Sequence, residues 1–167
     1  MEKPPVIVTI QYIYTLLNLL TKISRQDLDH RLVANNAKVT RLQYVVIRFL
    51  SHQHFTIREL SHKLICEPAT LVPVVDHLEK KGLVIRTNDP KDRRRNPLVL
   101  TEEGLEVLRS VEPYHPENTL VKGLTQLGPE KTQQLRDLLH ELTTSVVKEE
   151  DIQHAVMSWQ VPIIDDH

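Results

Sequence analysis

The chain has 167 residues, with 21 Lys and Arg against 22 Asp and Glu, four glycines and one cysteine. This length suits one domain, or one domain with extensions, and a single cysteine excludes an internal disulfide and fits a reducing cytoplasm. The sequence has no glycine-rich phosphate-binding loop and no cluster of cysteine ligands, and we expect no apolar run long enough to cross a bilayer. We therefore expect a cytoplasmic protein that is not an enzyme, binds no cofactor and has no membrane partner.

The charge is distributed unevenly along the chain. Residues 36–100 carry twelve Lys and Arg against six Asp and Glu, a net charge of +6, whereas residues 101–167 carry five against thirteen, a net charge of −8. Concentrated positive charge is how affinity for phosphates is built. The pattern favours nucleic-acid binding by the middle of the chain, although a run of charge is more often only a solvated face.

Two helices are predicted before the helix-turn-helix. The first covers residues 6–32 and has one apolar stripe, formed by Ile13, Leu16, Leu17, Leu20 and Ile23. The second begins with a capping box of Thr40 and Gln43 and has the clearest amphipathic pattern of the chain, formed by Leu42, Val45, Val46, Phe49 and Leu50. We expect this second helix to pack beneath the two helices that follow it.

The stretch from residue 56 to residue 100 predicts a winged helix-turn-helix. Thr56 and Glu59 form a capping box that starts a short helix, a second helix follows Cys66, and Gly82 stands where that helix needs a left-handed residue at its end. Residues 83–87 and 97–100 are β-type segments joined by a polar, cationic tip. A helix of this kind suits the major groove of duplex DNA, and an arginine-rich tip suits the minor groove.

Several short motifs in this stretch resemble the MarR family in their order and spacing. They are Glu67-Pro68-Ala69-Thr70, the run from Val75 to Arg86, Asp89-Pro90-Lys91-Asp92-Arg93-Arg94, and Leu100-Thr101-Glu102-Glu103-Gly104. The resemblance extends more weakly to about Glu150. It implies a dimeric winged-helix transcription regulator, of a kind often released from DNA by a small ligand or by oxidation.

The fold expected from these patterns is mostly α with a small β-hairpin wing. A MarR-type domain is expected over residues 1–150, with the DNA-binding winged helix at 36–100, its helix-turn-helix at about 56–81 and its wing at 83–100. The N- and C-terminal helices, 6–33 and 101–150, would form a dimerisation region.

The C-terminal part is expected to contain two interruptions. Thr101 would cap a helix that Pro113 and Pro116 then break, and Gly128 with Pro129 would separate the last long helix. Residues 151–167 form an extension that either docks on another surface, such as a partner subunit, or is an unstructured tail.

The candidate DNA-binding residues lie on the recognition helix and on the wing. They are Pro68, Ala69, Thr70, Val72, Pro73, His77, Lys91, Arg93, Arg94 and Arg95. The helix would contact bases mainly through apolar groups and the Thr70 hydroxyl, unless Thr70 only caps the helix. Pro73 either kinks this helix or lies in its first turn, with the regular part starting near Thr70.

Other residues have supporting or alternative roles. The family pattern implies that Asp89 or Asp92 orients an arginine and braces the wing. For Arg86 the alternatives are a phosphate contact, an ion pair and contact with an anionic effector. Cys66 is expected to be a buried, inert thiol, and the alternative is a redox switch, because the helix that starts just after it would lower its pKa. His52 and His54 lack an acidic or cysteine neighbour, so no metal is predicted.

These observations predict a homodimer that represses transcription from a palindromic operator in double-stranded DNA and is released by a small-molecule effector. Two alternatives are a winged helix used for protein contact and a regulator that responds to redox state or to a metal.

Overall fold

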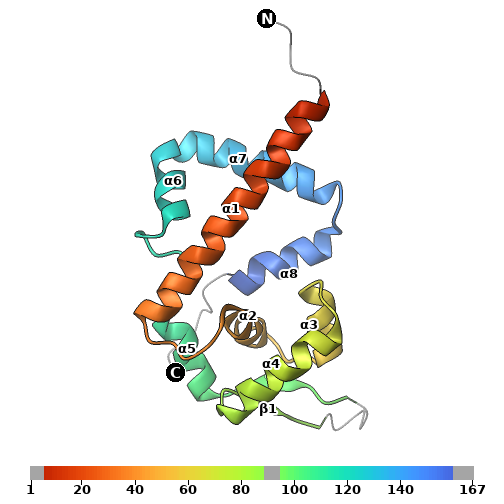
Figure 1. The fold of residues 1–167 in the computed structure, drawn as a ribbon. Helices are drawn as coiled ribbons and strands as arrows, with labels where there is room; N and C mark the ends of the chain where they lie inside the picture. The colour runs from red at the N-terminus through yellow and green to blue at the C-terminus, as the bar shows by residue number, and fades with distance from the viewer. Residues whose placement is uncertain (1–5, 89–94, 160–167) are drawn as a thin grey trace, which may run out of the picture.

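The computed structural model describes residues 6–88 and 95–159, and within them the fold is mostly helical with one small antiparallel sheet (Figure 1). In chain order the elements are α1 (Val6–Ala34), α2 (Arg41–Leu50), α3 (Ile57–Lys63), α4 (Pro68–Lys80), β1 (Val84–Arg86), β2 (Leu98–Leu100), α5 (Glu102–Ser110), α6 (Thr119–Leu127), α7 (Pro129–Thr144) and α8 (Glu149–Trp159). Val84 pairs with Leu100 and Arg86 with Leu98 across the hairpin. The predicted fold, mostly α with a small β-hairpin wing, is confirmed.

Three predicted helix starts are confirmed by their capping bonds. Thr40 and Thr56 are the N-caps of α2 and α3, and each forms a complete capping box, with Gln43 and Glu59 respectively. Thr101 caps α5 by accepting a hydrogen bond from a backbone N–H of its first turn at 3.1 Å. These interactions join residues that are three positions apart, so local sequence is sufficient to set them.

The turns after α3 and α4 both use a residue in the left-handed region. Gly82 follows α4 with a φ of +70°, as predicted, and its N–H donates to the Glu79 carbonyl at 2.9 Å. After α3 the corresponding place is taken by Ile65, which has a φ of +50° and is 90% exposed. A β-branched residue is disfavoured in this region, so the turn between the two helices carries backbone strain that no sequence pattern indicated.

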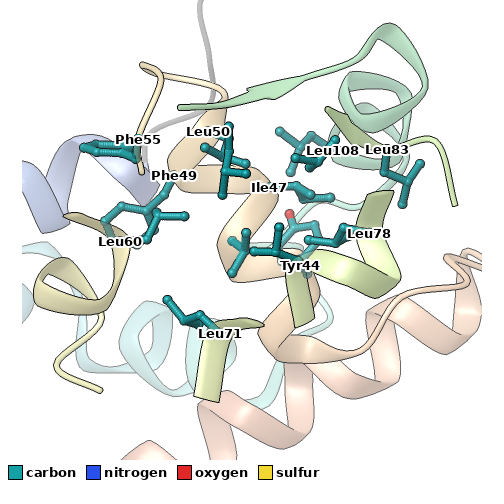
Figure 2. Packing of buried hydrophobic residues seen from close by; sticks show 14 of the residues in the cluster. Tyr44, Ile47, Phe49, Leu50, Phe55, Leu60, Leu71, Leu78, Leu83 and Leu108 are labelled. Atoms are coloured by element: carbon teal, nitrogen blue, oxygen red, sulfur yellow. The ribbon is translucent and has the colours of Figure 1, made fainter. Parts of the chain in front are cut away.

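Helix α2 is the centre of the hydrophobic core (Figure 2). Its buried side chains are Gln43, Tyr44, Val46, Ile47, Arg48, Phe49 and Leu50. Of the predicted stripe, Val46, Phe49 and Leu50 are buried, Val45 is half-buried against the core, and only Leu42 is exposed. The elements that contact α2 include α1, α4, α5, β2 and α8, so the burial of each of its side chains depends on neighbours that helical periodicity does not encode.

Tyr44 ties α2 to the end of α5. Its hydroxyl donates a buried hydrogen bond to the Val111 carbonyl at 3.1 Å. Arg48 is also buried, and its Nη1 donates to the Tyr44 hydroxyl oxygen at 3.4 Å. Burial raises the pKa of Tyr44, so the hydroxyl keeps the proton that it donates.

The predicted interruptions between the C-terminal helices are confirmed. The segment with Pro113 and Pro116 separates α5 from α6, and Gly128, with a φ of +80°, separates α6 from α7. The start of α6 is capped from another helix, because the Asp27 carboxylate of α1 accepts a hydrogen bond from the Leu120 N–H at 3.0 Å. Burial opposes ionisation of Asp27, but this backbone bond helps to lower its pKa below the ordinary value.

Helix α1 exposes most of its apolar side chains. Ile10, Ile13, Leu17 and Leu20 are between 37% and 43% exposed, and their spacing of three and four residues places them on one face. The N-terminal end of α1 extends away from the other helices (Figure 1).

By length and composition, α1 is the one helix within the described residues that is long and apolar enough to cross a membrane. The expectation that the chain holds no such run is therefore wrong. Polar residues such as Gln11 and Asn18 interrupt the run, but the isoleucines, leucines and valines around them keep its average hydropathy high. A soluble helix that packs on a partner passes the same test.

The C-terminal extension is helical over its described part. Helix α8 begins at Glu149, slightly before the predicted start of the extension, and packs against α2, α3 and α7. The Lys63 Nζ at the end of α3 lies 3.6 Å from the Asp151 Oδ1. The unstructured-tail alternative is therefore wrong for residues 151–159, which dock on the winged helix of their own chain.

Candidate nucleic-acid interface

The outer face of α4 carries all six candidate contacts of the recognition helix. Each of them is exposed: Pro68, Ala69, Thr70, Val72, Pro73 and His77. Leu71, Val75 and Leu78 are fully buried on the opposite face. The helical period sets this division, so α4 presents a surface of small and apolar groups with one hydroxyl and one imidazole.

Pro73 lies inside α4, in its second turn, and not in a first turn that starts later. The helix begins at Pro68 with Glu67 as its N-cap, so Thr70 is not the cap. Because proline has no N–H, the Ala69 carbonyl loses the hydrogen bond that residue 73 would otherwise donate. Ala69 and Pro73 are both exposed, so this carbonyl lies where water or a groove edge can reach it.

Arg86 joins the wing to the recognition helix. Its guanidinium donates to Asp76 Oδ1 at 2.6 Å and also forms an ion pair with Glu79, and both carboxylates belong to α4. The hydrogen bond to Asp76 raises the pKa of Arg86, so this guanidinium stays charged at every physiological pH. Of the three alternatives for Arg86, the structure shows the ion pair, which holds β1 against α4.

Arg95 joins the other side of the wing to α3. Its Nη2 lies 2.6 Å from Glu59 Oε1, while Glu59 Oε2 accepts the Thr56 N–H that starts α3. Burial acts to raise the pKa of Glu59, but the bonds from Thr56 and the charge of Arg95 outweigh it and lower that pKa. The sequence alone did not indicate this pair, because the two residues are 36 positions apart. In the free protein Arg95 braces the wing, in addition to its predicted role on DNA.

The other wing candidates lie outside the described residues. They are Asp89, Lys91, Asp92, Arg93 and Arg94. Their expected roles, bracing by an aspartate and DNA contact by the basic side chains, stay predictions. The described ends of the wing already limit its position, because Arg86 and Arg95 tie it to different helices of the helix-turn-helix.

Cys66 is half-buried in the turn between α3 and α4. Burial raises the pKa of its thiol, and the Glu67 carboxylate raises it further. The expected lowering by the start of α4 is therefore outweighed. A higher pKa means less thiolate at neutral pH, which argues against the redox alternative.

We predict that the Cys66 thiol reacts with iodoacetamide more slowly than free cysteine at pH 7.5, and that its rate rises with pH beyond the ordinary titration range of a thiol. Glu67→Gln removes a negative neighbour, so it is expected to lower the pKa and speed the reaction. The exposed, distant Glu130→Gln is the matched control and should leave the rate unchanged. A rate above that of free cysteine at pH 7.5 would restore the redox alternative.

A mostly apolar cleft of about 700 Å³ opens between α1, α2, α6 and α7. Its apolar lining includes Leu17, Leu20, Leu42, Val45, Leu124 and Leu139. Leu42, the exposed residue of the predicted core stripe, therefore faces the cleft, and the half-buried Val45 lies beside it. Two cations, Arg25 and Arg41, also line it, and Arg41 Nη1 is paired with Asp29 Oδ2 at 2.5 Å. Across residues 6–88 and 95–159, no three metal-binding side chains come together.

Comparison with known proteins identifies relatives of the whole architecture. The family model of the MarR family matches residues 39–95. The HTH-type transcriptional regulator FarR of Neisseria gonorrhoeae is 32% identical over 114 residues, which cover 67% of this chain and 77% of FarR.

Two solved structures extend this similarity to three dimensions. Sco3205, a MarR family transcriptional regulator from Streptomyces coelicolor in complex with DNA, has a TM-score of 0.68 and 25% identity, over 84% of this chain and 93% of Sco3205. CouR from Rhodococcus jostii RHA1, bound to p-coumaroyl-CoA, has a TM-score of 0.63 and 26% identity, over 82% of this chain and 95% of CouR. The residues that the family model matches include α4 and the ion pairs of Arg86 and Arg95 that brace the wing. The similarity to FarR and Sco3205 covers most of both chains. This chain therefore belongs to the MarR family of winged-helix, DNA-binding transcriptional regulators.

Proposed function

We propose that this protein is a cytoplasmic, homodimeric repressor that binds a palindromic operator. The observation that carries the proposal is an exposed apolar face of α1 outside the cleft, formed by Val6, Ile10, Ile13 and Leu16. A soluble monomer rarely leaves a continuous apolar face in water. A second copy would cover this face across a two-fold axis and would place two α4 helices about one DNA turn apart.

The exposed face of α4 would enter the major groove, and the wing would reach the adjacent minor groove. Because Ala69, Val72 and Pro73 offer no side-chain hydrogen bonds, base recognition would depend on contact with thymine methyl groups and on DNA shape. Specificity from α4 alone is then modest. The position of the wing, which Arg86 and Arg95 brace, becomes correspondingly important.

The wing variants Arg93→Ala and Arg94→Ala are each expected to weaken binding to every duplex. Each lost phosphate contact should lower the slope of log affinity against log salt by about one unit. Fluorescence anisotropy on a duplex selected by the wild type and on an unrelated duplex, from about 50 to about 200 mM salt, measures both effects. Lys131→Ala removes the same charge from an exposed position on α7 and should keep the wild-type slope. An unchanged slope in the wing variants would mean that the tip does not touch phosphate.

The operator can be identified by sequencing the genomic fragments that the purified protein retains. Retained fragments that share an inverted repeat, with half-sites about one DNA turn apart, would support the dimeric repressor. Enrichment of a sequence without internal symmetry would contradict it. Placement of the repeat over a promoter favours repression, because bound protein would then block polymerase.

We infer that the cleft between α2 and the helices α1, α6 and α7 holds a small, largely apolar effector. Its size suits a small molecule, and its lining is mostly apolar. The similar protein CouR was solved with a ligand, p-coumaroyl-CoA, which supports effector binding in general and not the apolar character proposed here. A compound that binds better when the winged helix is in an orientation that does not fit the operator would shift the protein away from the DNA-binding state. Compounds that raise the melting temperature and also release the selected duplex would identify this effector.

A further inference from the structure

We propose that α8 is a strut that sets the orientation of the helix-turn-helix relative to α7, with Asp151 and Lys63 as its positioning pair. DNA binding follows from the family, whereas the predicted effect on the operator rests on the proposed dimer.

The placement of α8 is the first observation. It lies between α7 on one side and α2 and α3 on the other (Figure 1). Only a short turn, residues 145–148, connects α7 to α8, and the Val147 N–H in this turn donates back to the Thr143 carbonyl of α7 at 2.8 Å. A helix that packs on both sides and follows a short turn transmits a displacement of α7 to α3.

The contact between α8 and α3 is specific. Lys63 Nζ lies 3.6 Å from Asp151 Oδ1, and the Lys63 side chain is only 22% exposed. Asp151 lies in the first turn of α8, where the helix dipole favours an anion, and Lys63 lies in the last turn of α3, where it favours a cation. Ile152, the next residue of α8, is half-buried, so it is seated beside this pair, whereas Val156 is 55% exposed.

The ion pair of Lys63 and Asp151 lies next to the turn that leads into the recognition helix, α4. Lys63 is the last residue of α3, and the strained turn at Ile65 leads directly into α4. Asp151 therefore acts on DNA through the position of α3 and α4. Only an operator requires a fixed distance between two recognition helices, so loosening the strut should reduce operator affinity more than affinity for unrelated DNA.

The test compares two substitutions that change the charge identically. Asp151→Lys breaks the pair, whereas Glu150→Lys makes the same charge change at the adjacent, exposed position in the same helical turn. Both variants alter the helix dipole and the attraction to DNA alike, so the difference between them reports the docking of α8. In the full-length protein without DNA, hydrogen exchange in α8 should be about threefold faster in Asp151→Lys than in Glu150→Lys, as expected for the loss of one partly exposed ion pair.

The second measurement compares binding affinity for a duplex selected by the wild type with affinity for an unrelated duplex of equal length. The ratio of the two affinities should fall about threefold in Asp151→Lys relative to Glu150→Lys. The charge swap supplies the rescue: in a Lys63→Glu background, adding Asp151→Lys should slow exchange in α8 and raise the affinity ratio, which reverses its effect in the wild type. A role of Asp151 in α8 stability alone would not produce this reversal.

Equal hydrogen-exchange rates in α8 and equal affinity ratios in Asp151→Lys and Glu150→Lys would contradict the proposal that α8 is a strut. Faster exchange with an unchanged affinity ratio would also overturn it, because α8 would then dock without positioning the helix-turn-helix. If the wild type selected no symmetric duplex, the proposed palindromic operator would fail. The exchange arm would still decide whether the pair seats α8.

Discussion

Ile13→Asp is expected to convert the protein from dimers to monomers and to weaken operator binding about a hundredfold, because two linked DNA-binding modules gain at least that much over one. Ile13 lies in the middle of the exposed apolar face of α1. If a second copy covers this face, the aspartate would be buried in the interface without a partner. The free energy of burying that unpaired charge is large enough to prevent dimerisation.

Sedimentation velocity at micromolar concentration gives the oligomeric state of the variant, and anisotropy on the selected duplex gives the affinity. Gln11→Asp is the matched control, since it introduces the same charge at an exposed polar position of the same helix. It should leave the dimer and its affinity nearly unchanged. A dimeric Ile13→Asp protein with wild-type affinity would show that α1 does not form the interface.

Gly104→Ala is expected to lower the free energy of unfolding by about 2 kcal/mol, the usual scale for overpacking a core. A Cβ atom at Gly104 would lie 2.5 Å from the Leu83 carbonyl oxygen and 2.4 Å from a methyl carbon of Leu100. The Leu100 side chain can rotate away, but the Leu83 carbonyl cannot move freely, because it accepts a hydrogen bond from the Thr101 N–H at 3.1 Å. The new methyl group therefore pushes α5 away from the base of the wing.

Urea unfolding at a single protein concentration measures this loss, since the stability of a dimer depends on concentration. Gly123→Ala in α6 is the matched control, because nothing lies within 4 Å of a Cβ atom at that position. It should stabilise the protein by about 0.5 to 1 kcal/mol through helix propensity. Equal effects of the two substitutions would mean that the contact between α5 and the wing is loose.

Local sequence was enough to predict most of the fold. The capping threonines, the left-handed Gly82 and the breaks at Pro113 and Gly128 each depend on neighbouring residues, and each is confirmed. The same reasoning failed where distant elements decide burial. Leu42 belongs by periodicity to the core stripe, but it faces the cleft because α1, α6 and α7 lie opposite it.

The candidate DNA-binding residues also fall into those that local sequence could place and those that depend on distant elements. The exposed positions of α4 follow from the helical period, so Thr70 and His77 could be placed from sequence. The partners of Arg86 and Arg95 could not, because each ion pair joins two elements whose relative position only the fold defines. For Cys66 the raised pKa agrees with the expected inert thiol, whereas the lowered pKa that the redox alternative required is outweighed by burial and the adjacent Glu67.

Two contacts between distant helices fix the two ends of the segment that joins α5 to α6. Tyr44 fastens the end of α5 to the winged helix, whereas Asp27 fastens the start of α6 to α1. Residues 112–117 between them contain no helix and include Pro113 and Pro116, whose φ angles are fixed. A rotation of the winged helix against α1, α6 and α7 would therefore have to bend residues 112–117 and also residues 35–40, which join α1 to α2, and it would displace α8 from α2 and α3. Because few dihedral angles are free in these places, the axis of such a rotation is restricted.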